Sequence, residues 1–426
     1  MAESNNILDI LNAFGNTFYS FWWLILAWPL WYIFDNIWFE YVAIYSADSW
    51  HGKLKWTMLE IIPPRDIEKG PKPMEIFFTG LAGVITTHNT FVKYLKGAYT
   101  YDRFGLELVG EEGKVHYYIR ALKHHRNMVE AQIYAQYPEA QILEVEDYYN
   151  KFPKIIPNRD WDLWGTDFQF VKKDPYYPIR TYDQFEESIT GEMIDPMAAL
   201  VEVLGQLGPG QHLWLQFVLS PVQEPDSMKA GKALLDELKG RPVAESGGRL
   251  LHDITDVLSN LFGALFAPPE FKSVDAKKEE QPLDIRLSPM ERDVLKAVEE
   301  NLGKNFFKTK MRMIYLSRRE NFHGALGKSA FIGALKQFND LNMNQFKPEE
   351  ISKTYGKIFF VDRIANLRKR KLYDRYRKRN MDGTNIMLST KELATLFHFP
   401  NISVKSPAIT QTTSKLGAAP PNLPVE

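Results

Sequence analysis

The sequence predicts an α+β protein: a single N-terminal transmembrane helix, then duplicated ferredoxin-like (βαββαβ) modules with a helical insertion, then a basic C-terminal helix. Three observations predict this arrangement. Residues 18–34 carry no charge, and eight of the twelve residues from 368 to 379 are basic. Between these segments, strand and helix periodicities alternate in residues 50–150 and again in residues 160–360.

The composition indicates a folded chain of more than one unit. Its 426 residues exceed one typical domain of ~100–200 residues. The net charge of −1 argues against a protein that binds nucleic acid over its whole surface. The absence of cysteine excludes disulfides, thiolate zinc sites, iron–sulfur clusters and cysteine nucleophiles.

Residues 18–46 are predicted to form the transmembrane helix, after a tail at 1–17. The 17 uncharged residues at 18–34 span roughly 25 Å as a helix, close to the hydrocarbon thickness of ~30 Å. Seven of the ten tryptophans lie in the first 56 residues, and tryptophan favours the headgroup boundary. The predicted membrane contacts are Trp22, Trp23, Trp28, Trp31 and Trp38.

Two other interpretations of this segment are a cleaved signal peptide and a buried core helix. A signal peptide needs a basic start, and no Lys or Arg precedes Lys53. The basic residues Lys53, Lys55 and Arg65 all follow the apolar run. The positive-inside rule then predicts a single-pass protein of the inner (plasma) membrane, with the N-terminus outside and the bulk of the chain cytoplasmic.

The first module, residues 50–150, has a β-α-β-β-α-β order. A strand at 54–62 precedes a helix that starts at Pro73. Alternating apolar residues on both sides of Gly110–Gly113 predict a hairpin. A second helix ends before Pro138, and a strand follows at 142–145. This order predicts the ferredoxin-like pattern.

The second module, residues 160–360, repeats the pattern around an insertion at 240–287. Three helices open with Pro-Met, at Pro73, Pro196 and Pro289, which indicates duplication, although proline is common in a first turn. Ser288 and Glu291 predict a capping box at the start of the third of these helices. In the insertion, residues 250–265 form an apolar helical stripe that either lies on lipid or packs on protein. The Asp253 and Asp256 carboxylates favour protein.

Catalytic motifs are weak, so we expect no enzyme, cofactor site or metal site. The segment from Gly324 to Ser329 resembles a phosphate-binding loop, but Phe322 stands where the first glycine belongs. The pair His124-His125 has no third metal ligand at helical spacing. An ordinary loop and a surface histidine pair are the simpler interpretations.

Residues 361–400 are predicted to form a basic amphipathic helix and a short capped helix. The basic helix is expected to contact DNA or an acidic partner, or lipid headgroups, or to be only a solvated face. The short helix begins with a capping box of Ser389 and Glu392. Residues 401–426 form a Pro-rich extended tail. The candidate contacts are Arg368, Lys369, Arg370, Lys371, Arg375, Arg377, Lys378 and Arg379.

Two segments carry a family resemblance. The run Leu388-Ser-Thr-Lys-Glu-Leu-Ala-Thr-Leu-Phe-His-Phe-Pro400 and the tail Pro420-Pro-Asn-Leu-Pro424 resemble the region ahead of the motor in bacterial type IV secretion and conjugation coupling (HerA/FtsK-like) ATPases. Similarity also extends to residues 74–78 and 134–138. The chain is therefore similar to the membrane-anchored N-terminal region of that family.

The resemblance implies a role in moving DNA or protein, with a hexameric motor. The Walker motifs of such a motor are absent from this sequence, so we expect either a split system or a truncated chain. We expect a non-catalytic adaptor, anchored in the lipid bilayer, that docks a separately encoded P-loop ATPase, contacts DNA and forms a homo-oligomer. The alternative is a membrane scaffold of another envelope complex.

Overall fold

The computed structural model describes residues 16, 19–21, 23, 27, 29–35, 37–38, 54–64, 67–84, 103–172, 174–185, 194–222, 224–239, 287–355, 360–402, 404 and 409. The chain divides into two compact units. One comprises Met1–Trp56 and Thr86–Asp102, and the other comprises Thr57–Ile85 and Arg103–Glu426. The sheet and the helices that pack on it belong to the second unit.

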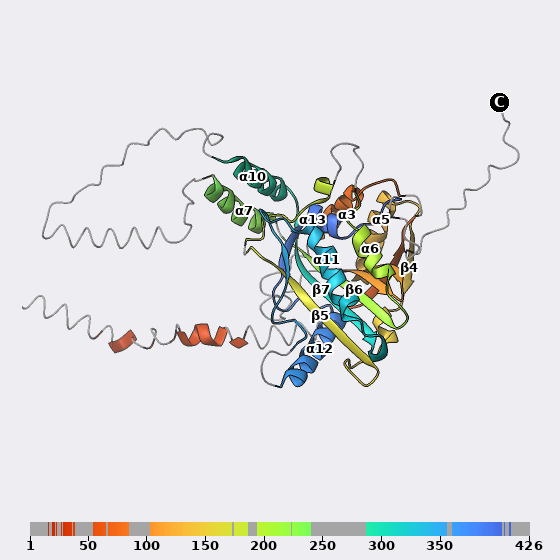
Figure 1. Ribbon diagram of the computed structural model, residues 1–426. Helices are drawn as coiled ribbons and strands as arrows, with labels where there is room; N and C mark the ends of the chain where they lie inside the picture. Colours follow the sequence, from red (N-terminus) through yellow and green to blue (C-terminus); the bar gives the residue numbers. More distant parts are fainter. Residues whose placement is uncertain are drawn as a thin grey trace, which may run out of the picture. The chain divides into compact units, whose positions relative to one another are not determined.

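A nine-stranded sheet forms the centre of the described fold (Figure 1). Eight strands follow the order β4-β1-β3-β2-β6-β7-β5-β8, and β9 pairs with the first part of β7. The strands are β1 (Trp56–Ile62), β2 (Phe104–Glu111), β3 (Lys114–Leu122), β4 (Gln141–Val145), β5 (Trp161–Phe170), β6 (Gln211–Pro221), β7 (Phe306–Arg318), β8 (Phe346–Pro348) and β9 (Ile386–Ser389).

The prediction of separate ferredoxin-like modules behind a transmembrane helix is wrong, because the strands of both predicted modules belong to one sheet. β2 and β6 join them over eight antiparallel pairs, from Phe104↔Leu219 to Glu111↔His212. Two separate modules would each leave one of these strands as an edge with unpaired N–H and C=O groups. Their mutual pairing removes both edges.

The two halves of this sheet connect their strands in the same way. The first half runs β1-α3-β2-β3-α5-β4, and the second runs β5-α6-β6-β7-α11-β8 with α7 and α10 inserted between β6 and β7. From the junction outward, the order is β2-β3-β1-β4 on one side and β6-β7-β5-β8 on the other. The halves are thus related by an approximate two-fold repeat about the β2–β6 pair.

Five helices cover one face of the sheet and enclose the main core (Figure 1). Alternate strand residues such as Leu106, Leu108 and Leu215 point into this core. The helices are α3 (Lys72–Ala82), α5 (Arg126–Gln136), α6 (Ala198–Gly205), α11 (Phe331–Leu335) and α13 (Thr390–Leu396). The predicted starts of α3, α6 and α13 and the predicted end of α5 are confirmed to within a few residues.

A different set of elements covers the opposite face. Helix α12 (Val361–Lys378) and the 3₁₀ turn at Tyr148–Lys151 pack there in a second apolar cluster. Leu372, Tyr373 and Tyr376 of α12 meet Trp214 and Ile314 of the sheet. Helices α7 (Glu224–Leu238) and α10 (Pro289–Leu302) pack on each other and form a third cluster with Tyr176 and Phe306.

Local signals explain several element ends. The hairpin turn between β2 and β3 uses Glu112 and Gly113, both at positive φ (51° and 84°), as a two-residue hairpin turn requires. Ser288 and Glu291 form the predicted capping box of α10. The start of α13 has the same box, at Ser389 and Glu392. Both predictions are confirmed.

The predicted transmembrane helix at residues 18–46 is wrong, because no helix in the described part of the chain is long and apolar enough to cross a membrane. A span needs about 20 consecutive apolar residues in one helix. The inner-membrane location and the orientation inferred from that helix are wrong with it. Trp23 and Trp31 are exposed at described helical positions, Trp38 is half-buried, and Trp22 and Trp28 lie outside the described residues.

Two other predictions cannot be compared with the fold. The apolar stripe at 250–265 lies outside the described residues, as does most of the Pro-rich tail after residue 402. Ile409 is described, and it forms a parallel bridge with Val115 of β3.

Candidate functional site

One row of polar side chains crosses four strands on the face that α12 covers. The register pairs Glu107 with Gln216 across β2 and β6, and Gln216 with Arg312 across β6 and β7. Arg312 in turn lies opposite Asp167 on β5. These four residues, which we call the polar row, are fully buried. Charged groups this deep in a protein require partners.

Hydrogen bonds run along the polar row without a break. Gln216 Nε2 donates to Glu107 Oε1 at 2.9 Å, and Arg312 Nη1 donates to Gln216 Oε1 at 3.3 Å. Arg312 Nε then donates to Asp167 Oδ1 at 2.8 Å. The row therefore joins the two halves of the sheet through side chains as well as through the β2–β6 ladder.

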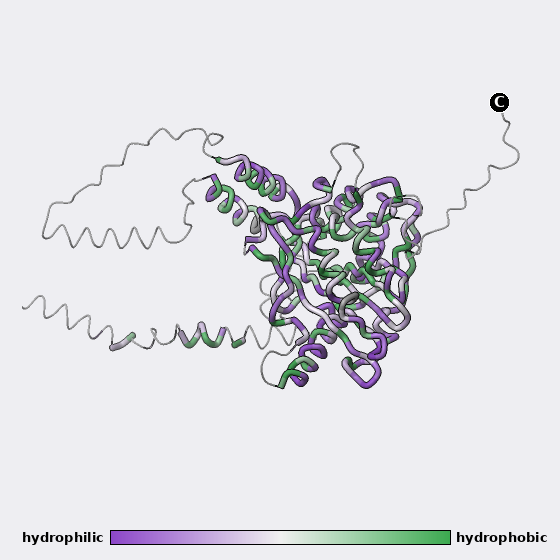
Figure 2. Tube along the Cα trace, viewed as in Figure 1, coloured by the Kyte–Doolittle hydropathy of each residue, from purple (hydrophilic) through white to green (hydrophobic). Residues whose placement is uncertain are grey.

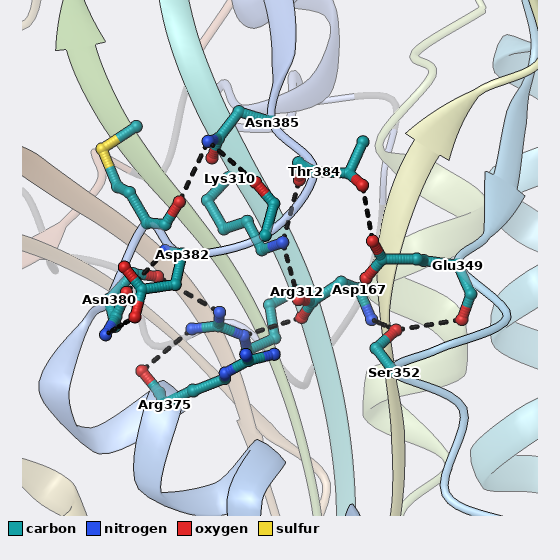
Figure 3. A network of polar contacts seen from close by, with 12 residues as sticks. Asp167, Lys310, Arg312, Glu349, Ser352, Arg375, Asn380, Asp382, Thr384 and Asn385 are labelled. Carbon is teal, nitrogen blue, oxygen red and sulfur yellow. Dashed lines mark hydrogen bonds and ion pairs between the residues drawn. The ribbon is translucent and has the colours of Figure 1, made fainter. Parts of the chain in front are cut away.

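Asp167 is held between two buried cations (Figure 3). Lys310 Nζ lies 2.7 Å from its Oδ2, and Arg312 binds its Oδ1. Burial raises the pKa of Asp167, but the two positive charges outweigh burial and leave that pKa below its ordinary value. Ser352 Oγ also accepts from the Asp167 N–H, at 2.8 Å.

Arg312 uses its remaining N–H groups to hold the C-terminal end of α12, and Lys310 holds the loop that follows it (Figure 3). Arg312 donates to the Arg375 carbonyl at 2.9 Å and to the Asn380 carbonyl at 3.2 Å. Lys310 Nζ donates to the Thr384 carbonyl at 2.8 Å. A helix C-terminus carries partial negative charge and unpaired carbonyls, so a buried cation stabilises it there.

A third cation, Arg379, directly follows α12 and fixes the same end of the helix to the sheet. It binds Glu107 through Nε (2.8 Å) and Nη2 (3.0 Å), and Asp147 through Nη1 (2.6 Å) and Nη2 (2.8 Å). Burial raises the pKa of Glu107, but Arg379 outweighs burial and holds that pKa below its ordinary value. Burial raises the pKa of Asp147 and exceeds the opposing effect of Arg379. Arg379 itself has positive φ (48°) directly after the helix, in the position where a chain commonly leaves an α-helix.

Aromatic side chains also help to attach α12 to the sheet. The Tyr148 and Tyr376 hydroxyls are 2.6 Å apart in the core, and Tyr373 Oη donates to the Pro153 carbonyl at 3.1 Å. Gly165 of β5 lets α12 approach, because a Cβ there would lie 2.7 Å from Leu372 Cδ2 and 2.6 Å from the Met313 carbonyl oxygen. The C-terminal half of α12 is therefore fixed to the sheet by charge, hydrogen bonds and packing.

The structure separates the eight predicted contact residues into two groups. Four are used inside the fold: Arg379 in the buried ion pairs, Lys369 on Asp162 (2.6 Å), and Arg368 and Arg377 on the carbonyls of Tyr355 and Lys154. Of the other four, Arg375 is half-buried and Lys378 is ion-paired with Asp374, while Arg370 and Lys371 are exposed.

One cation of this surface falls outside the predicted set. Arg363 is exposed in the first turn of α12, upstream of the dense basic run. We call Arg363, Arg370 and Lys371 the exposed basic face. Within the described part of the chain, these three side chains have no hydrogen-bond or ion-pair partner.

The other candidate motifs have structural roles. Gly327 lies in a π-helical turn, Ala325–Ala330, and a Cβ there would lie 2.2 Å from the Tyr315 ring. Lys328 Nζ of the same turn lies 5.6 Å from the Trp164 ring centre. In the described residues, no group of three or more His, Cys, Asp or Glu side chains could hold a metal ion.

The motif that carries the family resemblance lies in the main core. Three buried polar side chains of this segment contact the chain at residues 179, 182 and 195. Glu392 Oε1 accepts from the Ile179 N–H (2.9 Å), and Thr395 Oγ1 accepts from the Tyr182 N–H (3.0 Å). His398 Nε2 lies 2.9 Å from Asp195 Oδ1. The other resembling segment, 420–424, lies outside the described residues.

The comparison with known families assigns the chain to one of them. A search of curated proteins finds no match. Residues 46–412 match the family described as "Domain of unknown function (DUF8128)", and this range covers both halves of the sheet, α12 and α13. The protein therefore belongs to the DUF8128 family.

Proposed function

We propose that the protein is a non-catalytic adaptor that binds nucleic acid through the exposed basic face of α12. The observation that carries this proposal is a contrast between the two sides of one helix. The buried side is fixed by Arg312, Arg379 and Tyr376, whereas Arg363, Arg370 and Lys371 stand in solvent without acidic partners among the described residues.

The spacing of these cations suits an extended polyanion. Arg363 and Arg370 are seven residues apart, which places them on the same side of the helix about 10 Å from each other. Lys371 is also exposed, about 100° around the helix from Arg370. Arginine guanidinium groups bind phosphate oxygens in pairs, and lysine supplies a compact positive charge.

Two acids close to this surface already have cationic partners. Asp374 lies 3.0 Å from Lys378, and Asp162 is 2.6 Å from Lys369. Asp362 precedes Arg363 in the first turn, where a carboxylate stabilises the positive end of the helix dipole. A fixed row of cations that lacks internal partners attracts phosphates at long range.

The wider role that we propose is that of an adaptor for DNA translocation which docks a separately encoded ATPase. This part of the proposal is supported only by the sequence resemblance described above. The binding of nucleic acid by α12 does not depend on it and is tested separately.

The experiment measures fluorescence anisotropy of labelled DNA with the full chain. The variant Arg363→Glu/Arg370→Glu/Lys371→Glu reverses the charge of the exposed basic face. The matched control is Lys229→Glu/Lys232→Glu/Lys296→Glu, which reverses three exposed cations on α7 and α10. We expect the first variant to lose at least tenfold in affinity and the control to bind like the wild type. Equal affinity for both variants would disprove the proposal.

A further inference from the structure

Phe360, the residue directly before α12, has a backbone conformation that is unfavourable for a bulky residue. Its backbone lies in the left-handed region (φ 50°, ψ 43°), which bulky side chains rarely adopt. The residue is 73% exposed, and its side chain has no polar atom with which to cap the helix. Neither burial nor capping therefore accounts for this residue. Backbone strain of this kind concentrates at functional sites.

Other apolar groups lie at the same end of α12. Leu367, two turns along the helix, is 65% exposed. Tyr355 is 39% exposed, and its carbonyl accepts from Arg368 Nη1 at 2.9 Å, which holds its segment against the helix. Figure 2 shows that α12 starts with hydrophobic residues and continues as a hydrophilic stretch. The exposed Phe360 thus lies three residues before the first cation of the exposed basic face, Arg363.

We infer that this end of α12 binds unpaired bases, so that the nucleic acid recognised by the protein is single-stranded. Phe360 provides the surface on which a base stacks, while Arg363 and Arg370 hold the phosphates that follow. This inference rests on the proposed function. Cations combined with exposed aromatic rings are the combination that binds single strands without reading their sequence.

Duplex DNA fits this surface less well. In a duplex each base is already stacked and paired, so an exposed ring finds no free base surface, and only the phosphates are left for the cations. The Phe360 ring should therefore increase the affinity for single strands alone, whereas the cations should increase the affinity for both forms.

The test compares labelled oligothymidylate of about 20 nucleotides with a duplex of the same length. The variant Phe360→Asn removes the ring, and asparagine tolerates left-handed φ and is a good residue to start a helix. Phe360→Trp restores a larger ring. The matched control is Leu341→Asn, which removes an apolar side chain that is 85% exposed outside α12.

The expected result is that Phe360→Asn weakens single-strand binding about 5- to 150-fold, while duplex binding stays unchanged. Phe360→Trp and Leu341→Asn should bind single strands like the wild type. Two results would overturn the inference: Phe360→Asn binds both forms like the wild type, or it weakens the binding of both forms equally. If charge reversal of the exposed basic face still weakens the binding of both forms, the proposed function stands. If the wild type binds neither form, both proposals fail.

Discussion

Glu107 and Arg379 are 272 positions apart in the chain and form a two-armed ion pair in the core, with Nε–Oε1 at 2.8 Å and Nη2–Oε2 at 3.0 Å. Glu107 belongs to the β2–β6 junction, and Arg379 follows the last residue of α12. This pair therefore connects the centre of the sheet to the helix that carries the exposed cations.

The first prediction concerns this pair. Replacing Arg379 by methionine leaves the Glu107 and Asp147 carboxylates without their cation in the core, which should cost about 3–5 kcal/mol of the free energy of unfolding. The neighbouring Lys378→Met removes the exposed ion pair with Asp374 and should cost less than about 1 kcal/mol. Urea unfolding measures both. Similar losses for the two variants would show that the buried pair contributes little.

The second prediction is a loss of stability in acid. The pKa values of Glu107, Asp167 and Asp195 are held below their ordinary values of 4.5, 3.8 and 3.8. Nearby cations outweigh burial at Glu107 and Asp167, and His398 together with the N–H groups of Asn401 and Met197 does so at Asp195. The unfolded chain then binds more protons, so this stability is present above those ordinary values and is lost as the pH falls. We expect a lower urea midpoint at about pH 3 than at about pH 5. An unchanged midpoint would contradict the lowered pKa values of these three carboxyl groups.

The contribution of Glu392 to stability changes with pH in the opposite direction. Burial raises its pKa to about 7, so its contribution to stability is present below its ordinary value of 4.5 and is lost as the pH rises towards 7. Together the two effects place the highest stability near about pH 5. The same urea series, extended to about pH 8, measures this decline. A midpoint that rises steadily from pH 5 to 8 would be inconsistent with a raised pKa for Glu392.

The third prediction tests the approach of α12 to the sheet. Gly165→Ala places a Cβ 2.6 Å from the Met313 carbonyl oxygen, so the strand or the helix must shift, at a cost of about 1–3 kcal/mol. Gly333→Ala is the matched control, because a Cβ there meets no atom within 4 Å. Thermal unfolding should separate the two variants. Equal melting temperatures would show that α12 can shift away from residue 165 without a loss of stability.

The fourth prediction compares two capping boxes of the same chemistry. Ser389→Ala removes the cap of α13, where the Glu392 N–H is buried, whereas Ser288→Ala removes the cap of α10 at an exposed position. Loss of a cap costs about 1 kcal/mol, and an unsatisfied buried donor adds about 1–3 kcal/mol. We therefore expect the larger loss of stability for Ser389→Ala. Equal losses would indicate that water reaches the start of α13.

Much of the local structure could be predicted from the sequence. The hairpin of β2 and β3 and both capping boxes carry strong short-range signals, and these predictions are confirmed. The joining of both halves into one sheet could not be predicted, because strand periodicity does not show which edges pair. The apolar run at 18–34 has a suitable composition for a span, but composition alone does not make a spanning helix.

The candidate site was only partly visible in the sequence. The density of basic residues identified α12, but it could not show that Arg379 is buried while Arg370 is exposed. The polar row gave a weaker signal: Glu107 and Arg312 each interrupt an apolar strand, between Leu106 and Leu108 and between Met311 and Met313. A charge inside a buried strand pattern indicates a partner elsewhere, and only the register identifies it.

The salt dependence of DNA binding tests the central claim most directly. Affinity is measured between about 50 and 200 mM salt for the wild type and for the triple charge reversal of Arg363, Arg370 and Lys371. Each lost phosphate contact should reduce the slope of log affinity against log salt by about 0.7–0.9. The account predicts a slope smaller by about 2 or more in the variant. An identical slope in the wild type and the variant would show that the exposed basic face of α12 does not touch phosphate.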